Sequence, residues 1–235
     1  MISERDFANN YGFFWRETMP NLESVTRSLN LGSTTEWPPM PELSNPGRRD
    51  LVSETAYRLA ELQFNNRNID AKVLYSHAQA AAMRDISRLT RHYTSQSPAE
   101  LTGQEIDEVF AAFRRIYGVA FAQARFAETL FRPHFPGHGF IGDCEGDLRS
   151  GSDLFEFKYV SRSFRSSDFK QALVYIALHW LSTGAAIDCI RLINPFRGAV
   201  ISVRTDELLN ASGAISLHEF CHRFSYCTSA GDISR

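Results

Sequence analysis

The chain has 235 residues, of which 43% are hydrophobic, and its formal net charge at pH 7 is −2. This composition is typical of a globular protein with one large core or two small ones, and the charge excludes a surface that is basic throughout. No apolar run reaches the roughly 18 residues of a membrane-spanning helix, and the first residues, MISERDFANN, have no apolar signal stretch. We therefore expect a cytoplasmic protein with no membrane partner.

The first hundred residues predict a mainly helical region. A proline-rich stretch over residues 37–47 predicts a loop or linker. The apolar and alanine-rich spacing that follows predicts helices over residues 49–66 and 69–93. We expect residues 1–100 to recognise a substrate, a protein partner or a second copy of the chain.

A long amphipathic helix is predicted next. Residues 97–100, Ser-Pro-Ala-Glu, combine a capping serine, a proline and a glutamate in the order that begins a helix. One apolar stripe then recurs at intervals of three and four residues, through Ile106, Val109, Phe110, Phe113, Tyr117, Ala120, Phe121, Ala124 and Leu130. Pro133 ends the pattern, and a period of two follows. We expect this stripe to pack on a sheet.

The second half of the chain predicts strands and one helix. Alternation over residues 139–148, a Ser-Gly-Ser turn at 150–152 and alternation over 153–160 predict a hairpin. A helix over residues 168–182 and strands over 187–193 and 199–203 follow. The fold class is therefore α/β (α+β), with a mixed central sheet flanked by helices in a domain over residues 101–235.

The predicted hairpin carries charges where apolar residues are expected. Residues two apart share a face of a strand, so Glu156 and Lys158 point the same way. Asp143, Glu145 and Asp147 share a face of the other strand by the same rule. A solvated sheet face with a cross-strand salt bridge is one explanation, and a catalytic site is the other.

Three short motifs resemble those of a known family. Asp147, Glu156-Phe157-Lys158 and Gln171-Ala-Leu-Val-Tyr175 look like the acid, E-x-K and Q-x-x-x-Y motifs of the PD-(D/E)XK nuclease superfamily, in its RecB-like branch. The resemblance covers roughly residues 125–210, and glycine replaces the usual proline before Asp147. It implies a restriction-endonuclease-like core and a nuclease of DNA that serves restriction, phage defence or repair. It also implies that Gln171 and Tyr175 shape the active site and contact DNA.

Phosphodiester hydrolysis needs an activated water and neutralisation of charge on the phosphate oxygens, which Mg²⁺ or Mn²⁺ supplies. Asp147 and Glu156 are the expected ligands, and the backbone carbonyl of Phe157 is a third. Lys158 would stabilise the negative charge of the transition state. Glu128, expected on the long helix, is an auxiliary ligand candidate because relatives sometimes supply an acid from that helix.

A basic segment follows the hairpin. Residues 158–170 carry a net charge of +3, from four basic residues and Asp168. Arg162, Arg165, Lys170 and Gln171 are the expected nucleic-acid contacts, although a solvated loop has the same composition. Phe164 within the segment either stacks on a base or anchors the loop to the core.

Two further alternatives remain open in the sequence. The four cysteines are expected to be reduced thiols. A zinc site formed by His218, Cys221, His222 and Cys227 is an alternative, but its spacing matches no common zinc finger. Some RecB-like nucleases hold an iron–sulfur cluster, but the cysteines of this chain are not placed as that cluster requires. The chain could also be an inactive nuclease-fold module that binds nucleic acid or a protein. The intact Asp147, Glu156 and Lys158 set favours the enzyme.

Overall fold

A computed structural model of the chain describes residues 1–89, 100–124 and 127–230. The chain forms two compact units. The sheet unit contains Met1–Glu36, Glu128–Asn194 and Ala199–Arg235, and the helical unit contains Trp37–Ala127 and Pro195–Gly198. This division differs from the boundary expected at residue 100, because the N-terminal helices belong with the sheet and the long helix that was expected to cover the sheet belongs with the other helices.

The sheet of the first unit is mixed, which confirms the predicted fold class. Within the described residues it has six strands in the order β1-β8-β7-β6-β5-β2. β6 and β7 are parallel, and the other neighbours are antiparallel. A separate pair of short strands, β3 and β4, lies in the same unit. The strand bounds are β1 (Thr34–Thr35), β2 (Thr129–Phe131), β3 (His134–Phe135), β4 (Cys144–Glu145), β5 (Leu148–Ser150), β6 (Asp153–Phe157), β7 (Cys189–Asn194) and β8 (Ala199–Arg204).

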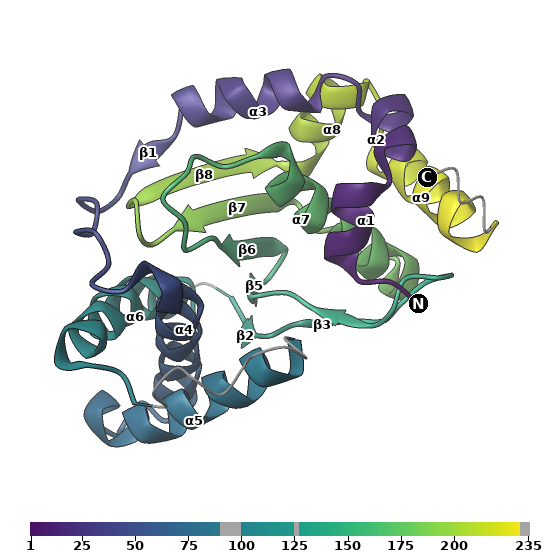
Figure 1. Cartoon of the computed structure of the whole chain (residues 1–235). Helices are drawn as coiled ribbons and strands as arrows, with labels where there is room; N and C mark the ends of the chain where they lie inside the picture. Colours follow the sequence, from purple (N-terminus) through teal and green to yellow (C-terminus); the bar gives the residue numbers. More distant parts are fainter. Residues whose placement is uncertain (90–99, 125–126, 231–235) are drawn as a thin grey trace. The chain divides into compact units, whose positions relative to one another are not determined.

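The helix α7 (Ser166–Thr183) joins the parallel strands β6 and β7. Parallel neighbours need a crossover connection, which is usually a helix. α7 packs against the sheet and also against α1, α3 and α9, so it is buried on nearly all sides (Figure 1). It is apolar on most of its surface for this reason. No helix in the described part of the chain is long and apolar enough to cross a membrane.

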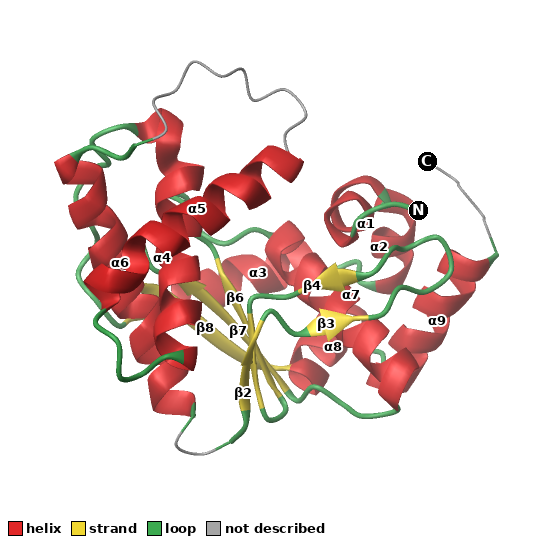
Figure 2. Ribbon diagram, turned by 90° about the horizontal axis from the view of Figure 1, so that it is seen from below, coloured by secondary structure: helices red, strands yellow, loops and turns green. Residues whose placement is uncertain are grey.

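The remaining helices of the sheet unit cover α7 and the end of the sheet. α1 begins with a capping box between Ser3 and Asp6 and buries Phe7 against α7. Figure 2 shows α7, α8 and α9 on the same side of the sheet. The bounds are α1 (Glu4–Asn10), α2 (Gly12–Thr18), α3 (Leu22–Leu31), α8 (Thr205–Gly213) and α9 (Leu217–Ser229).

The helical unit is built around α4, which packs against both α5 and α6. Its elements are η1 (Pro46–Arg48), α4 (Arg49–Asn65), α5 (Ala71–Leu89) and α6 (Gly103–Gln123). Within the helical unit, the apolar stripe of α6 packs against α4. Leu130, which was expected in this stripe, lies in β2 instead. A capping box between Thr102 and Glu105 begins the helix. The expected start at residues 97–99 lies outside the described residues.

The strand predicted over residues 139–148 is also wrong. His138 pairs with Ile141 in a tight turn, and Gly139 has a φ of 59°. A Cβ atom at Gly139 would lie 2.2 Å from the carbonyl oxygen of Thr228, so the turn requires glycine. After this turn β4 pairs with β3, and only β5 pairs with β6. The predicted β6, α7, β7 and β8 are present, with ends shifted by at most three residues.

Candidate active site

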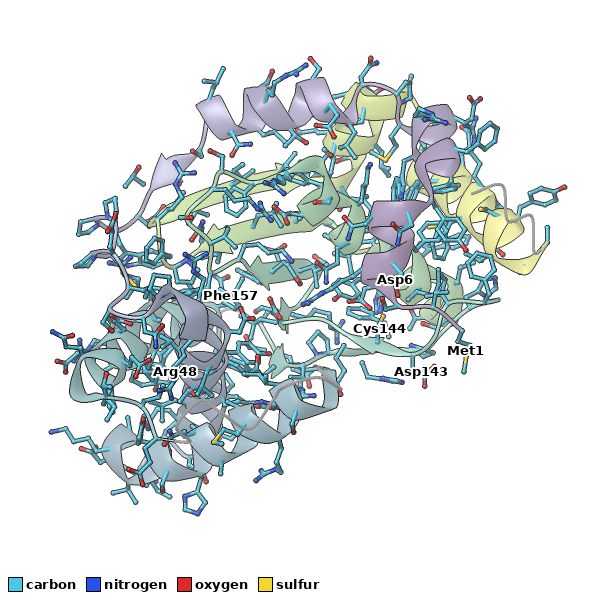
Figure 3. All side chains as sticks on the ribbon, in the orientation of Figure 1. Met1, Asp6, Arg48, Asp143, Cys144 and Phe157 are labelled. Carbon is cyan, nitrogen blue, oxygen red and sulfur yellow. The ribbon has the colours of Figure 1, made fainter. Side chains whose placement is uncertain are left out.

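The β5–β6 hairpin brings Asp147 and Glu156 together. Leu148 pairs with Phe155, so the preceding Asp147 lies beside Glu156. The Oδ2 atom of Asp147 accepts a hydrogen bond of 2.6 Å from the backbone N–H of Phe157, which is labelled in Figure 3. Glu156 is 2% exposed, on the same face of β6 as the core residue Leu154. Both acids are therefore fixed by the sheet.

Lys158 contacts Glu156 directly, as the shared strand face predicts. Its backbone N–H donates to the carbonyl of Ile193, which extends the parallel pairing beyond β6. Its Nζ atom donates to Glu156 Oε1 at 2.9 Å and to Gln171 Oε1 at 2.6 Å. The ammonium group is thus held between the hairpin and α7.

Gln171 and Tyr175 lie one turn apart on α7 and face the hairpin. Gln171 Nε2 donates to the hydroxyl of Tyr175 at 2.9 Å and to Glu4 Oε1 at 3.1 Å. The Tyr175 hydroxyl also donates to Glu4 Oε1, at 3.2 Å. Because the amide nitrogen is committed to Glu4 and Tyr175, its oxygen is turned toward Lys158. One chain of contacts therefore runs from Glu156 to Glu4.

Glu156 is buried and Asp147 is partly buried, and one lysine does not neutralise both acids. Burial and the charge of Glu156 raise the pKa of Asp147 to about 8, although Lys158, the Phe157 N–H and Arg5 favour the charged form. The Oε2 atom of Glu156 is buried and accepts no hydrogen bond within the described residues. A buried carboxylate oxygen without a partner is costly, so the site is suited to a cation.

The donor set fits a magnesium-type ion. Mg²⁺ is held by one or two carboxylates and keeps several waters, and Asp147 and Glu156 are such a pair. The described residues contain no group of three His, Cys, Asp or Glu side chains placed to hold a metal. The acids, together with backbone oxygen and water, would therefore have to supply the coordination.

Two residues of α1 belong to this site and were missed from sequence. Glu4 orients Gln171 and Tyr175, as described above. Arg5 is exposed and lies beside Glu4. Partial desolvation lowers the pKa of Arg5, but the combined attraction of Glu156, Tyr175, Glu4 and Asp147 outweighs that effect and raises it. Neither residue lies in a motif, and no local pattern indicates that α1 packs on α7.

Three acids proposed near the site lie elsewhere. Glu128 is in a loop before β2 rather than on a helix, and its carbonyl accepts from Gly151 at the turn of the hairpin, the end away from Asp147. Asp143 is exposed and accepts from the N–H of Gly137. Glu145 is half-exposed and pairs with Arg132. The expected placement of Glu128 on the long helix is therefore wrong, and its role as an auxiliary ligand stays a prediction.

The basic segment divides into structural and exposed parts. Arg162 donates two hydrogen bonds to Asp168, at 2.7 and 3.0 Å, and holds the first turn of α7. Phe164 is 4% exposed and packs in the core, which confirms the anchoring alternative. Arg165 is exposed, and Lys170 lies over the ring of Trp15. The nucleic-acid contacts predicted for these residues stay predictions.

The structure does not bring together the four side chains of the proposed zinc site. Cys221 is fully buried in the core, while His218 and His222 face each other on the surface of α9 with their Nε2 atoms 3.1 Å apart. Burial raises the pKa of the Cys221 thiol to about 12, so it stays protonated. The described cysteines are all free thiols.

Comparison with known proteins adds no relative. No family model, no curated protein and no solved structure matches this chain at a significant level. The chemistry of the site therefore has to be argued from its own geometry.

Proposed function

We propose that the chain is a metal-dependent nuclease that hydrolyses phosphodiester bonds in DNA. The observation that carries the proposal is the gathering of Asp147, Glu156 and Lys158 in one buried site, with a carboxylate oxygen of Glu156 left without a hydrogen bond. A bound Mg²⁺ or Mn²⁺ would activate water and neutralise phosphate charge there. The motif resemblance to the PD-(D/E)XK superfamily supports the same chemistry.

The arrangement of elements supports the finer fold assignment as well. The order β5, β6, α7 and β7 places the acids on a hairpin and the glutamine and tyrosine on the crossover helix. These are the positions that a RecB-like, restriction-endonuclease-like core implies for the three motifs. The fold alone carries no function, so the site residues decide the matter.

Each residue of the site has a role in this proposal. Asp147 and Glu156 hold the ion, and the Phe157 carbonyl is the third ligand. Lys158 would donate to the attacking water or to a phosphate oxygen. Gln171 holds the ammonium of Lys158 in place, and Tyr175 holds Gln171. Since the pKa of Asp147 is raised to about 8, ion binding near neutral pH must release a proton.

The competing function is a module that keeps the fold without cutting. The ion pair between Lys158 and Glu156, together with the lack of a third metal-binding side chain in the described residues, favours it. Such a module would bind nucleic acid or a protein, and the helical unit is the part that we propose for recognition or self-association in either case. Metal-dependent cleavage separates the two functions.

The test is cleavage of single- and double-stranded DNA and RNA with Mg²⁺, with Mn²⁺ and with EDTA. We expect Glu156→Gln to lose metal affinity and cleavage together, because it removes an anionic ligand while keeping the shape. Lys158→Ala should retain metal binding and slow cleavage at least ~100-fold, because both carboxylates remain while the charge that stabilises the transition state is lost. Calorimetry and single-turnover kinetics measure the two effects.

A matched control is Glu145→Gln, which removes a carboxylate from the exposed pair with Arg132. It should cut at the wild-type rate. No metal-dependent cleavage of any of the four substrates would reject the nuclease. Near wild-type cleavage by Lys158→Ala would reject the catalytic role of Lys158 and leave the E-x-K pattern as a salt-bridged structural hairpin.

A further inference from the structure

A surface pocket of about 480 Å³ lies in the sheet unit beside the start of α7. Its walls come from α1, α3 and the loop that leads into α7, which Figure 1 shows around one end of that helix. This volume is within the range of small-molecule sites and exceeds what a bare ion requires. The polar and charged residues that line the pocket include Asn30, Arg27, Arg165, Ser167, Lys170 and Glu23.

The pocket is predominantly cationic. Arg27, Arg165 and Lys170 line it, and in the described part of the chain none of the three forms an ion pair. The one acid in the lining, Glu23, accepts a hydrogen bond from the hydroxyl of Ser166. Three positive charges against one negative charge create a local potential that attracts anions.

Lys170 is the cation that would gain most from an anion. Burial lowers its pKa, and the charge of Glu23 offsets this effect only in part. Its Nζ atom lies 5.6 Å from the centre of the Trp15 ring, which holds the ammonium at the pocket wall. A phosphate group in the pocket would compensate the desolvated charge of Lys170.

The wall of the pocket is preorganised. Asn30 accepts a hydrogen bond from the N–H of Phe164 at 3.1 Å and donates one to its carbonyl at 2.9 Å. These two bonds fix the loop before α7 to α3. The first turn of α7 adds backbone N–H groups at Ser167 and the positive end of an 18-residue helix. Rigid donors lose little entropy when a ligand binds.

We propose that this pocket binds a phosphate group of the nucleic-acid strand that the neighbouring site cuts. The inference rests on the proposed function for the identity of its ligand. The link is α7 itself, because Lys170 lines the pocket and the next residue, Gln171, holds Lys158 in the site. Ser167 and Gln171 are about one helical turn apart, roughly 6 Å along the axis, so one strand can reach both places.

The test is binding without cleavage. The full chain in EDTA is titrated against short single-stranded DNA that carries a phosphate at the 5′ end, at the 3′ end or at neither end, and fluorescence anisotropy reports affinity. We expect Arg27→Gln with Lys170→Gln to weaken binding at least ~10-fold and to lower the salt slope by about 1.4. Arg16→Gln, an exposed charge on α2 outside the pocket, should change affinity less than ~2-fold.

A second pair of variants separates a blocked pocket from a damaged fold. Ser167→Glu places a carboxylate in the first turn of α7, which favours the helix but occupies the anion position. Ser167→Gln has a similar shape without the charge. We expect Ser167→Glu to lose binding while its melting temperature is kept or raised, and Ser167→Gln to bind nearly as the parent does.

The outcomes are distinguishable. Preference for one phosphorylated end that disappears in Ser167→Glu assigns the pocket to that terminal phosphate, and equal loss for all three strands assigns it to a backbone phosphate. Affinity that is unchanged in both pocket variants, or that falls equally in Arg16→Gln, overturns the proposal. Pocket-dependent binding by a chain that cuts nothing would leave the phosphate site standing and reject the nuclease.

Discussion

Each unit of the chain contains a buried glutamate beside a cation, and the two sites differ in charge balance. In the helical unit, Glu105 is 1% exposed and lies 3.4 Å from the Nε atom of Arg48, which Figure 3 labels. In the sheet unit, Glu156 is 2% exposed and lies 2.9 Å from Lys158. The second pair has another acid beside it, the partly buried Asp147.

The surroundings of the two pairs show what the difference means. Glu105 also accepts from the N–H of Thr102, and Arg48 also donates to the carbonyl of Glu100, so this pair anchors the start of α6. The oxygen of Glu105 that lacks a hydrogen bond still faces Arg48. At the candidate site the lysine contacts one oxygen of Glu156 and leaves the other without a hydrogen bond. A balanced pair is expected to stabilise the fold, whereas an unbalanced one is suited to an added cation.

The largest expected effect tests that distinction by removing each cation in turn. Arg48→Met leaves Glu105 buried and uncompensated, so we expect the free energy of unfolding to fall by about 3–5 kcal/mol, with or without Mg²⁺. Lys158→Met should also destabilise the protein in EDTA, but Mg²⁺ should restore the loss because it takes the place of the missing charge. Urea unfolding in EDTA and in Mg²⁺ measures both.

The control for this comparison is the double variant Arg48→Met with Glu105→Gln, which removes both charges and should recover part of the stability. Rescue of Arg48→Met by Mg²⁺, or no rescue of Lys158→Met, would show that the two pairs do not differ in the way described.

A smaller effect follows from the raised pKa of Asp147. Its folded pKa of about 8 lies above the ordinary value of 3.8, so between these values the folded protein binds more protons than the unfolded chain. Stability of the metal-free protein should therefore fall as the pH rises through that window, by an amount on the order of 1–2 kcal/mol between pH 5 and 7. Asp147→Asn should flatten this part of the profile.

Thermal unfolding across that pH range, in EDTA, measures the slope. The matched control is Asp143→Asn, because Asp143 is exposed and its removal should leave the slope unchanged. If Asp147→Asn keeps the parent slope, then Asp147 is ionised throughout and the site is balanced after all.

The contrast between the units also shows what the sequence could predict. β6, α7, β7 and β8 were predicted because their periodicity is strong and their ends carry turn or capping residues. Glu156, Lys158, Gln171 and Tyr175 could be grouped because strand and helix periods fix which residues share a face. Asp147 was added by motif resemblance, and its position beside Glu156 followed from the hairpin.

The predictions that failed, and the residue that was missed, also have physical explanations. The period of α6 predicts an apolar stripe but not its partner, which within the helical unit is α4. The tight turn at Gly139 interrupts an alternation that reads as one strand. Glu4 was missed because its contact with α7 spans more than 160 residues of sequence and leaves no local pattern. The periodicity of the sequence therefore does not predict the long-range packing that completes the site.

The smallest expected effect tests that missed residue. Glu4→Gln keeps an oxygen that can accept from Gln171 or Tyr175 but removes the charge that strengthens both bonds. Gln171 would then hold Lys158 less firmly, so we expect single-turnover cleavage to slow about 3- to 10-fold. Stability should fall by about 1–2 kcal/mol, because two charge-assisted bonds are replaced by neutral ones. Glu17→Gln, an exposed acid on α2, is the matched control and should cut as the parent does. A loss as large as that of Lys158→Ala would instead place Glu4 among the groups that hold the ion, whereas no loss would mean that α7 alone orients Gln171.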